Sequence, residues 1–305
     1  MERRRPPRFY SIGILALAAV GACRPEQRAR SASALTVRDD AGRTIALAGP
    51  ARRIVSLSPA VTELLFALGA GDRVVGRTTW CDYPPATRAV PSVGDGLNPN
   101  VEAVAARRPD LVVLYPSPLN ETAAAQLERL GIAAAVVRQD RLEDVARAAR
   151  LLGRLTGRSA AGDSLARAMD GLLSASPEPP AANPESLAFV VWDNPPMVIG
   201  GGSYLDEIAT LAGAVNVFHD IGAASATVAL ETIVARDPDV VAVVRDSTEP
   251  EPPVWARRPE WQVIRAVRER RFVYLTGSLF GRPGPRAGRA AAELRRLLAA
   301  VGGAR

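Results

Sequence analysis

One thirteen-residue block occurs twice in this chain of 305 residues, and the repeat constrains the fold more than any other feature. Residues 102–114 read EAVAARRPDLVVL and residues 231–243 read ETIVARDPDVVAV, with six identical positions. Each copy predicts a short helix that begins at the Glu, stops at the Pro and leads into a buried strand. We therefore expect two lobes built on one plan, with a cleft between them rather than one continuous core.

The composition is that of a globular protein with room for two domains, since 48% of the residues are hydrophobic and 23% are charged. The formal net charge is +6, but four Arg against one Glu in residues 1–22 account for half of it. The remaining basic residues form no run and are interspersed with acidic ones. Nucleic-acid binding is therefore not supported.

The N-terminus has the pattern of an export signal. Basic residues precede the apolar stretch 12–20, which is too short to span a membrane. The sequence Val20-Gly21-Ala22-Cys23 resembles a bacterial lipobox, in which Cys23 is lipidated and becomes the first mature residue. The alternative is a simple secretory signal in which Cys23 is incidental. We predict a lipoprotein signal peptide at 1–23 and a tether at 24–34, which place the protein on the extracytoplasmic face of a bacterial membrane, held by a lipid anchor only.

Beyond the tether, strands alternate with helices, which predicts an α/β fold with mostly parallel sheets. In the first lobe we expect a hairpin, four strands and three helices, and in the second lobe a further set of strands and helices around the second repeat copy. The expected first-lobe elements are the hairpin 35–47, strands 53–57, 74–76, 110–114 and 132–137, and helices 59–68, 102–108 and 121–130; the second-lobe elements are strands 187–192 and 272–275 and helices 203–212 and 286–300.

Residues 142–173 contain helix formers with apolar side chains at three- and four-residue spacing and no Pro. This pattern predicts one long helix, kinked near Gly157, that connects the two lobes. The predicted lobes are then residues 35–141 and 174–305.

Several motifs, taken in order, resemble one family. They are RIVSLSPAVTELLFALGAGDRVVG, CDYPP, NPNVEAVAARRPDLVV, NVF, ETIVARDPDVV and RPGPR, spread over residues 35–300. Together they are similar to the substrate-binding proteins of bacterial ABC importers of the helical-backbone class, which bind cobalamin, haem or ferric siderophores, and most similar to the cobalamin-binding members. The resemblance implies two Rossmann-like lobes joined by one long backbone helix. It also implies a monomer that holds a corrinoid, a small-molecule metal chelate, in the cleft and delivers it to an ABC permease dimer with its ATPase. It implies no intrinsic cofactor.

The resemblance gives the repeat a role. In this family one surface Glu on each lobe docks on Arg pockets of the permease, and Glu102 and Glu231 match these positions. Carboxylates at helix starts are stabilised by the helix dipole and suit bidentate Arg pairing. The alternative is that each Glu only stabilises the start of its own helix.

Candidate ligand-binding residues lie outside the repeat, with Tyr115 expected at the carboxyl end of its strand, where open α/β sheets bind ligands. Aromatic and apolar walls with a few polar groups suit a large flat ligand. Two family Trp positions are Gly96 and Ser225 here, which leaves the ligand's identity open. The candidates are Ser58, Pro59, Trp80, Tyr83 and Tyr115 in the first lobe and Trp192, Asn194, Met197 and Arg282 in the second.

Haem is less favoured because the only His, His219, is expected at a helix end near the core, although Tyr83, Tyr115 or Tyr204 remains a candidate iron ligand. We interpret Cys81 as a structural thiol rather than a metal ligand. No spacing of His and carboxylates predicts a bare-metal site.

The competing class is an enzyme. The single His has no nucleophile-elbow Ser to serve, and Gly200-Gly201-Gly202-Ser203 lacks the Lys of a phosphate-binding loop. We read this segment as a turn in which Ser203 caps the next helix. A carboxylate-based secreted hydrolase stays open as an alternative, as does a lipoprotein that binds a partner protein without a ligand.

Overall fold

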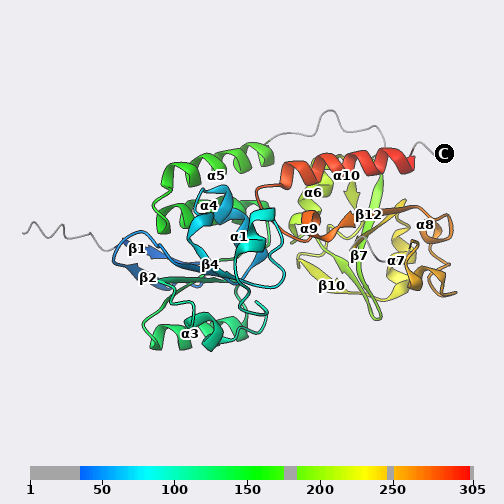
Figure 1. Cartoon of the computed structure of the whole chain (residues 1–305). Helices are drawn as coiled ribbons and strands as arrows, with labels where there is room; N and C mark the ends of the chain where they lie inside the picture. The colour runs from blue at the N-terminus through cyan, green and yellow to red at the C-terminus, as the bar shows by residue number, and fades with distance from the viewer. Residues whose placement is uncertain (1–34, 175–183, 246–250, 303–305) are drawn as a thin grey trace, which may run out of the picture. The chain divides into compact units, whose positions relative to one another are not determined.

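The computed structural model describes residues 35–174, 184–245 and 251–302, all within one compact unit that spans Ser33–Arg305 (Figure 1). The predicted signal peptide, Cys23 and the tether 24–34 lie outside the described residues. No helix in the described ranges is both long enough and apolar enough to cross a membrane.

The first lobe is built on a four-stranded parallel sheet in the order β4-β3-β5-β6. Helices α1, α4 and α5 lie on one side of this sheet and α3 lies on the other (Figure 1). The elements are β1 (Leu35–Arg38), β2 (Thr44–Leu47), β3 (Ile54–Ser56), α1 (Pro59–Ala67), η1 (Gly71–Arg73), β4 (Val74–Arg77), η2 (Pro85–Ala89), α2 (Val101–Ala105), β5 (Leu111–Leu114), α3 (Pro118–Arg129), β6 (Ala133–Val136), α4 (Leu142–Leu155) and α5 (Ser159–Ser174).

The second lobe has a mixed sheet in the order β10-β8-β7-β11-β12, with the short β9 also paired to β7. The pairs of β11 with β7 and β12 are parallel, whereas β8 pairs antiparallel with β7 and β10. The elements are β7 (Ser186–Asp193), β8 (Pro196–Ile199), α6 (Tyr204–Ala212), β9 (Val215–Asn216), β10 (Ser225–Thr227), α7 (Leu230–Arg236), β11 (Val240–Arg245), η3 (Val254–Arg257), α8 (Arg265–Arg268), β12 (Phe272–Thr276), α9 (Gly277–Phe280) and α10 (Ala287–Gly302).

The predicted α/β class and most predicted elements are confirmed. Pro59 occupies the first turn of α1, where a missing N–H leaves no intrahelical bond unmade, and Gly69 follows the helix with φ +70°. The antiparallel strands β8 and β10 were not predicted, because PMVI in β8 does not alternate between apolar and polar residues and β10 has only three residues.

Both repeat copies fold as the sequence predicts, into α2 followed by β5 and α7 followed by β11. The likeness extends to the backbone. Arg108 and Asp237 hold equivalent positions, directly before the Pro that both copies share. Both have positive φ, 48° and 39°. An Arg from outside each copy binds this turn: Arg53 donates to the carbonyl oxygens of residues 107 and 108, and Arg265 donates to the Asp237 carboxylate.

The predicted single long helix over residues 142–173 is wrong, although the interruption lies at Gly157, where a kink is predicted. The segment forms two helices, α4 and α5, and Gly157 between them has φ +66°, which interrupts a right-handed helix. The two helices fold back on each other, with the Arg150 guanidinium 2.6 Å from the Asp170 carboxylate. Gly153 and Gly162 face each other so closely that a Cβ on either would lie 3.1–3.2 Å from the other's Cα. The glycines therefore allow close helix packing.

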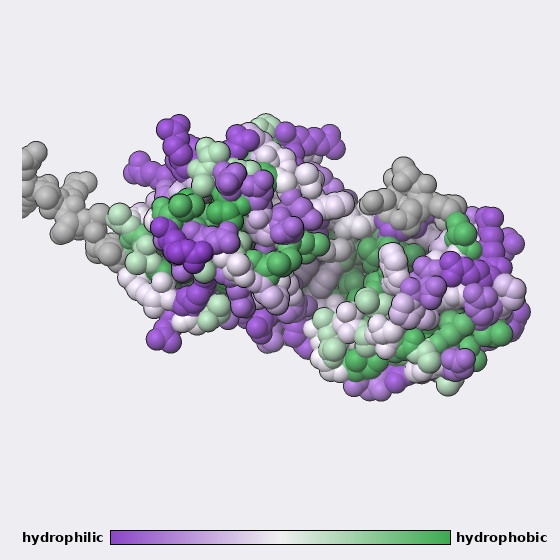
Figure 2. All heavy atoms as spheres, turned by 90° about the horizontal axis from the view of Figure 1, so that it is seen from below, coloured by the Kyte–Doolittle hydropathy of each residue, from purple (hydrophilic) through white to green (hydrophobic). Residues whose placement is uncertain are grey.

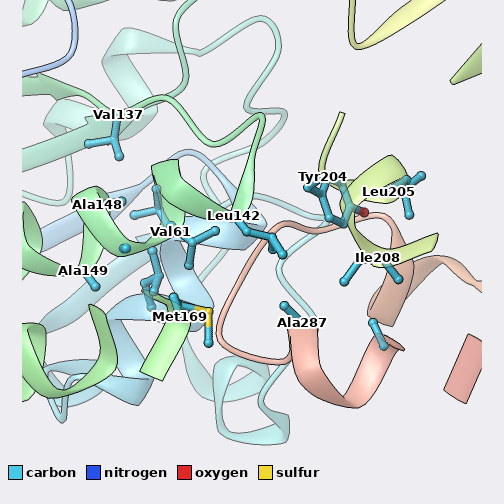
Figure 3. Close-up of a cluster of buried hydrophobic side chains, with 14 of the residues drawn as sticks. Val61, Val137, Leu142, Ala148, Ala149, Met169, Tyr204, Leu205, Ile208 and Ala287 are labelled. Carbon is cyan, nitrogen blue, oxygen red and sulfur yellow. The ribbon is translucent and has the colours of Figure 1, made fainter. Parts of the chain in front are cut away.

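One apolar cluster extends through both lobes, so the expectation of separate cores is also wrong. Alternate residues of each central strand enter it, for example Leu111 and Val113 in β5 and Leu187 and Phe189 in β7. Figure 3 shows Leu142, at the start of α4, between Val61 of α1 and residues of α6 and α10. The opposite faces of the two sheets are buried in two separate clusters. The lobes thus share one core on the α4, α6 and α10 side.

Candidate functional site

A cavity of about 540 Å³ lies where the two lobes meet, beside the shared core. Its walls follow directly after strands: Ser58 and Pro59 come after β3, Tyr115 after β5, and Gly277 after β12. This is the carboxyl edge of both sheets, where open α/β folds bind ligands. Seen from below, the surface is hollowed between the lobes (Figure 2).

A second cavity of about 320 Å³ adjoins the first and shares Ser58, Pro59, Trp80 and Tyr115 with it. The Trp80 side chain belongs to both cavities and is 63% exposed. A large exposed indole at a cavity wall is not a core residue, and the ligand-binding role of Trp80 stays a prediction. An aromatic face there offers a flat surface for stacking.

Gly96, one of the two positions that lack the family's Trp, lines the second cavity. A Cβ on Gly96 would lie 2.2 Å from the carbonyl oxygen of Leu57, so no larger residue fits this backbone. Gly96 therefore contributes backbone and no side chain to the wall of the second cavity beside Trp80. Ser225, the other such position, is exposed on β10.

Arg282 is the charged residue that the second lobe contributes to the large cavity. Its guanidinium spans the lobes: it donates to the Trp80 carbonyl oxygen at 2.8 Å and pairs with the Asp82 carboxylate. It also lies 3.6 Å from the Glu63 carboxylate. Arg282 therefore fixes the loop that carries Trp80, and its charge is already compensated by protein carboxylates.

Behind Arg282, Glu63 and Arg286 form a buried ion pair between the lobes. Two guanidinium nitrogens of Arg286 donate to the two Glu63 oxygens at 2.8 and 2.6 Å, and Glu63 is only 3% exposed. Burial raises the pKa of the Glu63 carboxyl, and the two arginines partly offset this effect. The Arg286 guanidinium also lies 3.8 Å from the centre of the Tyr83 ring. Tyr83 thus packs on this ion pair and is not among the residues that line the two cavities.

Tyr115 is held by a hydrogen bond from its hydroxyl to the Asp140 carboxylate at 2.6 Å. Burial and this carboxylate raise the Tyr115 pKa to about 12. The Asp140 carbonyl oxygen accepts from the backbone N–H of Tyr204 in the second lobe at 2.8 Å. Tyr204 itself is buried, which raises its pKa as well. Both tyrosines are therefore neutral at neutral pH.

Three predicted ligand residues of the second lobe form the β7–β8 hairpin and do not line either cavity. Trp192 is 60% exposed, and its indole N–H donates to the Asn194 carbonyl oxygen at 2.9 Å. Met197 is the strand partner of Trp192. The structure therefore brings Ser58, Pro59, Trp80, Tyr115 and Arg282 together and leaves the hairpin residues apart from them.

Glu102 and Glu231 are exposed and occupy the same position in their helices, the second residue of α2 and of α7. Among the described residues neither carboxylate has a hydrogen bond or an ion pair. The start of α2 is capped by a different residue, since the Asn100 side chain accepts from the Ala103 N–H at 2.9 Å. These carboxylates are therefore free to bind a partner.

The side chains of Cys81 and His219, which were considered as metal ligands, make hydrogen bonds within the protein. Cys81 is fully buried, where its sulfur accepts from the Thr62 hydroxyl at 3.1 Å, so it is a structural thiol. His219 was predicted to lie near the core, but its side chain is 72% exposed. Its Nδ1 lies 2.8 Å from the Asp206 carboxylate. No cluster of three or more His, Cys, Asp or Glu side chains within the described ranges could hold a metal ion.

The glycine segment before α6 packs against the backbone of residues 219–224. The N–H groups of Gly200, Gly201 and Gly202 donate to carbonyl oxygens of that loop at 2.7–3.2 Å. They are therefore not available to a phosphate group. Ser203 caps α6 as predicted, because its hydroxyl oxygen accepts from the Leu205 N–H.

Sequence reasoning missed Glu63, Arg286, Asp82 and Gln139. Gln139 follows β6 at the same sheet edge as Tyr115, so the rule that identified Tyr115 could have found it. The pairing of Glu63 with Arg286 joins residues 223 positions apart and leaves no local signal in the sequence.

Comparison with known proteins decides the family. The profile of the family described as periplasmic binding protein matches residues 54–279, most of the chain. The chain belongs to the periplasmic binding protein family. It is a binding protein and not an enzyme, and the hydrolase alternative is thereby excluded.

Relatives of this periplasmic binding protein cover most of its length. An uncharacterized ABC transporter substrate-binding lipoprotein of Bacillus subtilis, YvrC, is 29% identical over 265 residues, which are 83% of this chain and 81% of the relative. A vitamin B12-binding protein of Salmonella typhimurium is 30% identical over 200 residues, 65% of this chain and 74% of the relative. The solved structure of the heme-binding protein RhuT from Roseiflexus superimposes with a TM-score of 0.72 at 26% identity, covering 82% of this chain and 98% of that one. The family, its extracytoplasmic setting and the two-lobed fold are thus established.

Proposed function

We propose that this protein is a lipid-anchored, extracytoplasmic binding protein that captures a corrinoid, cobalamin, between its lobes and delivers it to an ABC permease dimer with its ATPase. The observation that carries this proposal is the pair of adjoining cavities, with Trp80 exposed between them and Tyr115 in both walls. Aromatic walls with few polar contacts suit a large flat macrocycle.

Charge at the site favours a corrinoid over haem. Haem carries two propionate carboxylates, whereas the rim of a corrin carries neutral carboxamides. Arg282, the cationic residue of the large cavity, is already paired with Asp82 and lies near Glu63, so its charge is compensated before any ligand binds. An iron ligand in the form of tyrosinate is also disfavoured, because the Tyr115 pKa is raised to about 12.

A haem receptor is the second candidate, and one observation favours it: the similar structure RhuT is a heme-binding protein. Tyr115, which lines both cavities, would be the candidate iron ligand, provided that it lost its proton and its bond to Asp140. A ferric-siderophore receptor belongs to the same class of alternatives.

Titration separates these candidates. The purified mature protein is titrated with cyanocobalamin and, in parallel, with haemin, and tryptophan fluorescence and visible absorption are recorded. We expect saturable quenching by cyanocobalamin, since the exposed Trp80 lies at the cavity. Binding of haemin with a shifted Soret band and no response to any corrinoid would replace the corrinoid proposal with the haem one.

Docking and anchoring complete the proposal. Glu102 and Glu231 would each bind an Arg pocket of one permease subunit, as exposed carboxylates at helix starts can do. Cys23 would carry the lipid, in line with the relative YvrC, which is named a lipoprotein. Mass spectrometry of the membrane-extracted protein should find a lipidated Cys23 at the N-terminus, and a Cys23→Ser variant should be released from the membrane. We propose that the protein acts as a monomer.

A further inference from the structure

Two buried side-chain amides line the cavities without full hydrogen bonding. Gln139 borders the large cavity and Asn120 borders the smaller one, and they are 4% and 1% exposed. Among the described residues, neither Oε1 nor Nε2 of Gln139 has a partner, and Oδ1 of Asn120 has none. Buried amide atoms without partners cost free energy, so they are uncommon in folded proteins unless they serve a function.

The backbone around Gln139 is held rigidly although its side chain is not. The next residue, Asp140, accepts from Tyr115 through its carboxylate and from the Tyr204 N–H through its carbonyl oxygen. Its own N–H donates to the Asp144 carboxylate at 2.9 Å. Gln139 is therefore fixed at the junction of the lobes, while no hydrogen bond holds its amide. Turning the amide into the cavity breaks no bond.

The chemistry of a matching ligand follows from what these atoms can do. The Nδ2 of Asn120 donates to the Tyr115 carbonyl oxygen at 2.8 Å, so its unpaired atom is an acceptor. Gln139 offers one acceptor and two donor hydrogens. A carboxamide, which both donates and accepts, can pair at once with the oxygen and with one N–H of Gln139. A carboxylate only accepts, so it would leave the Gln139 oxygen without a partner.

We propose that Gln139 binds a carboxamide of the ligand and makes the site select an amide-rimmed macrocycle over one that carries carboxylates. The inference rests on the proposed corrinoid function and names the group that is recognised. Asn120 supplies a second acceptor, in the smaller cavity. A site built to hydrogen-bond a group discriminates strongly against ligands that lack it, because its own polar atoms are then left unpaired.

The test uses two corrinoids that both lack the nucleotide loop. Dicyanocobinamide carries carboxamides around the ring, and dicyanocobyrinic acid carries carboxylates at those positions. Affinities of both are measured for the wild-type protein, for Gln139→Leu, and for Gln126→Leu, which makes the same change at an exposed site on α3. We expect the wild type to prefer dicyanocobinamide, Gln139→Leu to bind it roughly tenfold more weakly with that preference reduced, and Gln126→Leu to match the wild type.

Thermal unfolding of the ligand-free proteins adds an independent readout. We expect Gln139→Leu to melt at the same or a higher temperature than the wild type, because it removes buried unpaired atoms. If Gln139→Leu keeps both the affinity and the preference of the wild type, the inference is wrong and the amide is merely solvated, while the corrinoid function stands. If the wild type binds neither corrinoid, the proposed function itself fails.

Discussion

The two copies of the repeat have similar backbone conformations, but the residues that line the cavities differ between the two lobes. In both lobes a short helix, a residue with positive φ and a buried strand follow one another, and an Arg from elsewhere binds the turn. At the cavity the likeness ends. The first lobe supplies an exposed indole, a phenol and two amides, whereas the second supplies Arg282 and the two ends of α9, Gly277 and Gly281. The repeated residues thus build the scaffold, and the residues that do not repeat determine the chemistry.

The largest change in stability is expected from breaking the ion pair that joins the two lobes. Glu63→Leu leaves Arg286 buried without its carboxylate, and we expect a loss of about 3–5 kcal/mol in the free energy of unfolding. Denaturant titration measures it. Glu121→Leu, at an exposed carboxylate of α3, is the control and should change stability by less than about 0.5 kcal/mol. A Glu63→Leu variant as stable as this control would show that the pair does not hold the lobes together.

The two exposed tryptophans allow a direct comparison of a residue at the cavity wall, Trp80, with one outside both cavities, Trp192. Trp80→Ala should weaken cyanocobalamin binding by about 2 kcal/mol, roughly thirtyfold in Kd, because it removes the stacking surface. Trp192→Ala, on the hairpin of the second lobe, should change it by less than about 0.5 kcal/mol. Isothermal titration gives both values. Equal losses would mean that the ligand reaches the hairpin and that the second lobe also contributes an aromatic wall.

The repeat copies differ in their helix caps, and exchanging the caps tests how alike they are. Asn100 caps α2, whereas α7 has Ala229 in the equivalent extended conformation without a side-chain bond. Asn100→Ala should cost about 1 kcal/mol of stability, and Ala229→Asn should gain up to about as much. Thermal unfolding detects both changes. A destabilising Ala229→Asn would show that the two helix starts are not equivalent.

The smallest change in stability is expected at Glu102 and Glu231, the residues proposed to dock on the permease. Glu102→Ala and Glu231→Ala remove exposed carboxylates that make no bond within the described residues, so stability should change by less than about 0.5 kcal/mol. Cyanocobalamin affinity should be unchanged, while uptake of labelled cobalamin by cells should fall in each variant. If ligand affinity falls instead, the two carboxylates act in folding or in the cleft.

Local signals in the sequence predicted much of the fold. Pro59 and Gly69 delimit α1, the repeat gives one helix–strand unit in each lobe, and Ser203 caps α6, since each depends on a few neighbouring residues. The same kind of reasoning placed a kink near Gly157 but predicted one long helix on both sides of it, where the structure has two. Helical periodicity continues on both sides of Gly157, but this residue has positive φ and α5 packs back on α4.

The sequence by itself determined the α/β class, the two similar lobes and the sheet edge at which Tyr115 lies, because strand and helix propensities and stop signals act over short distances. Only the tertiary structure decided which side chains meet there. Arg282 meets Asp82 across 200 residues and Glu63 meets Arg286 across 223, and Gln139 is left buried without a partner. Such contacts depend on how the lobes share one core, and no local pattern records them.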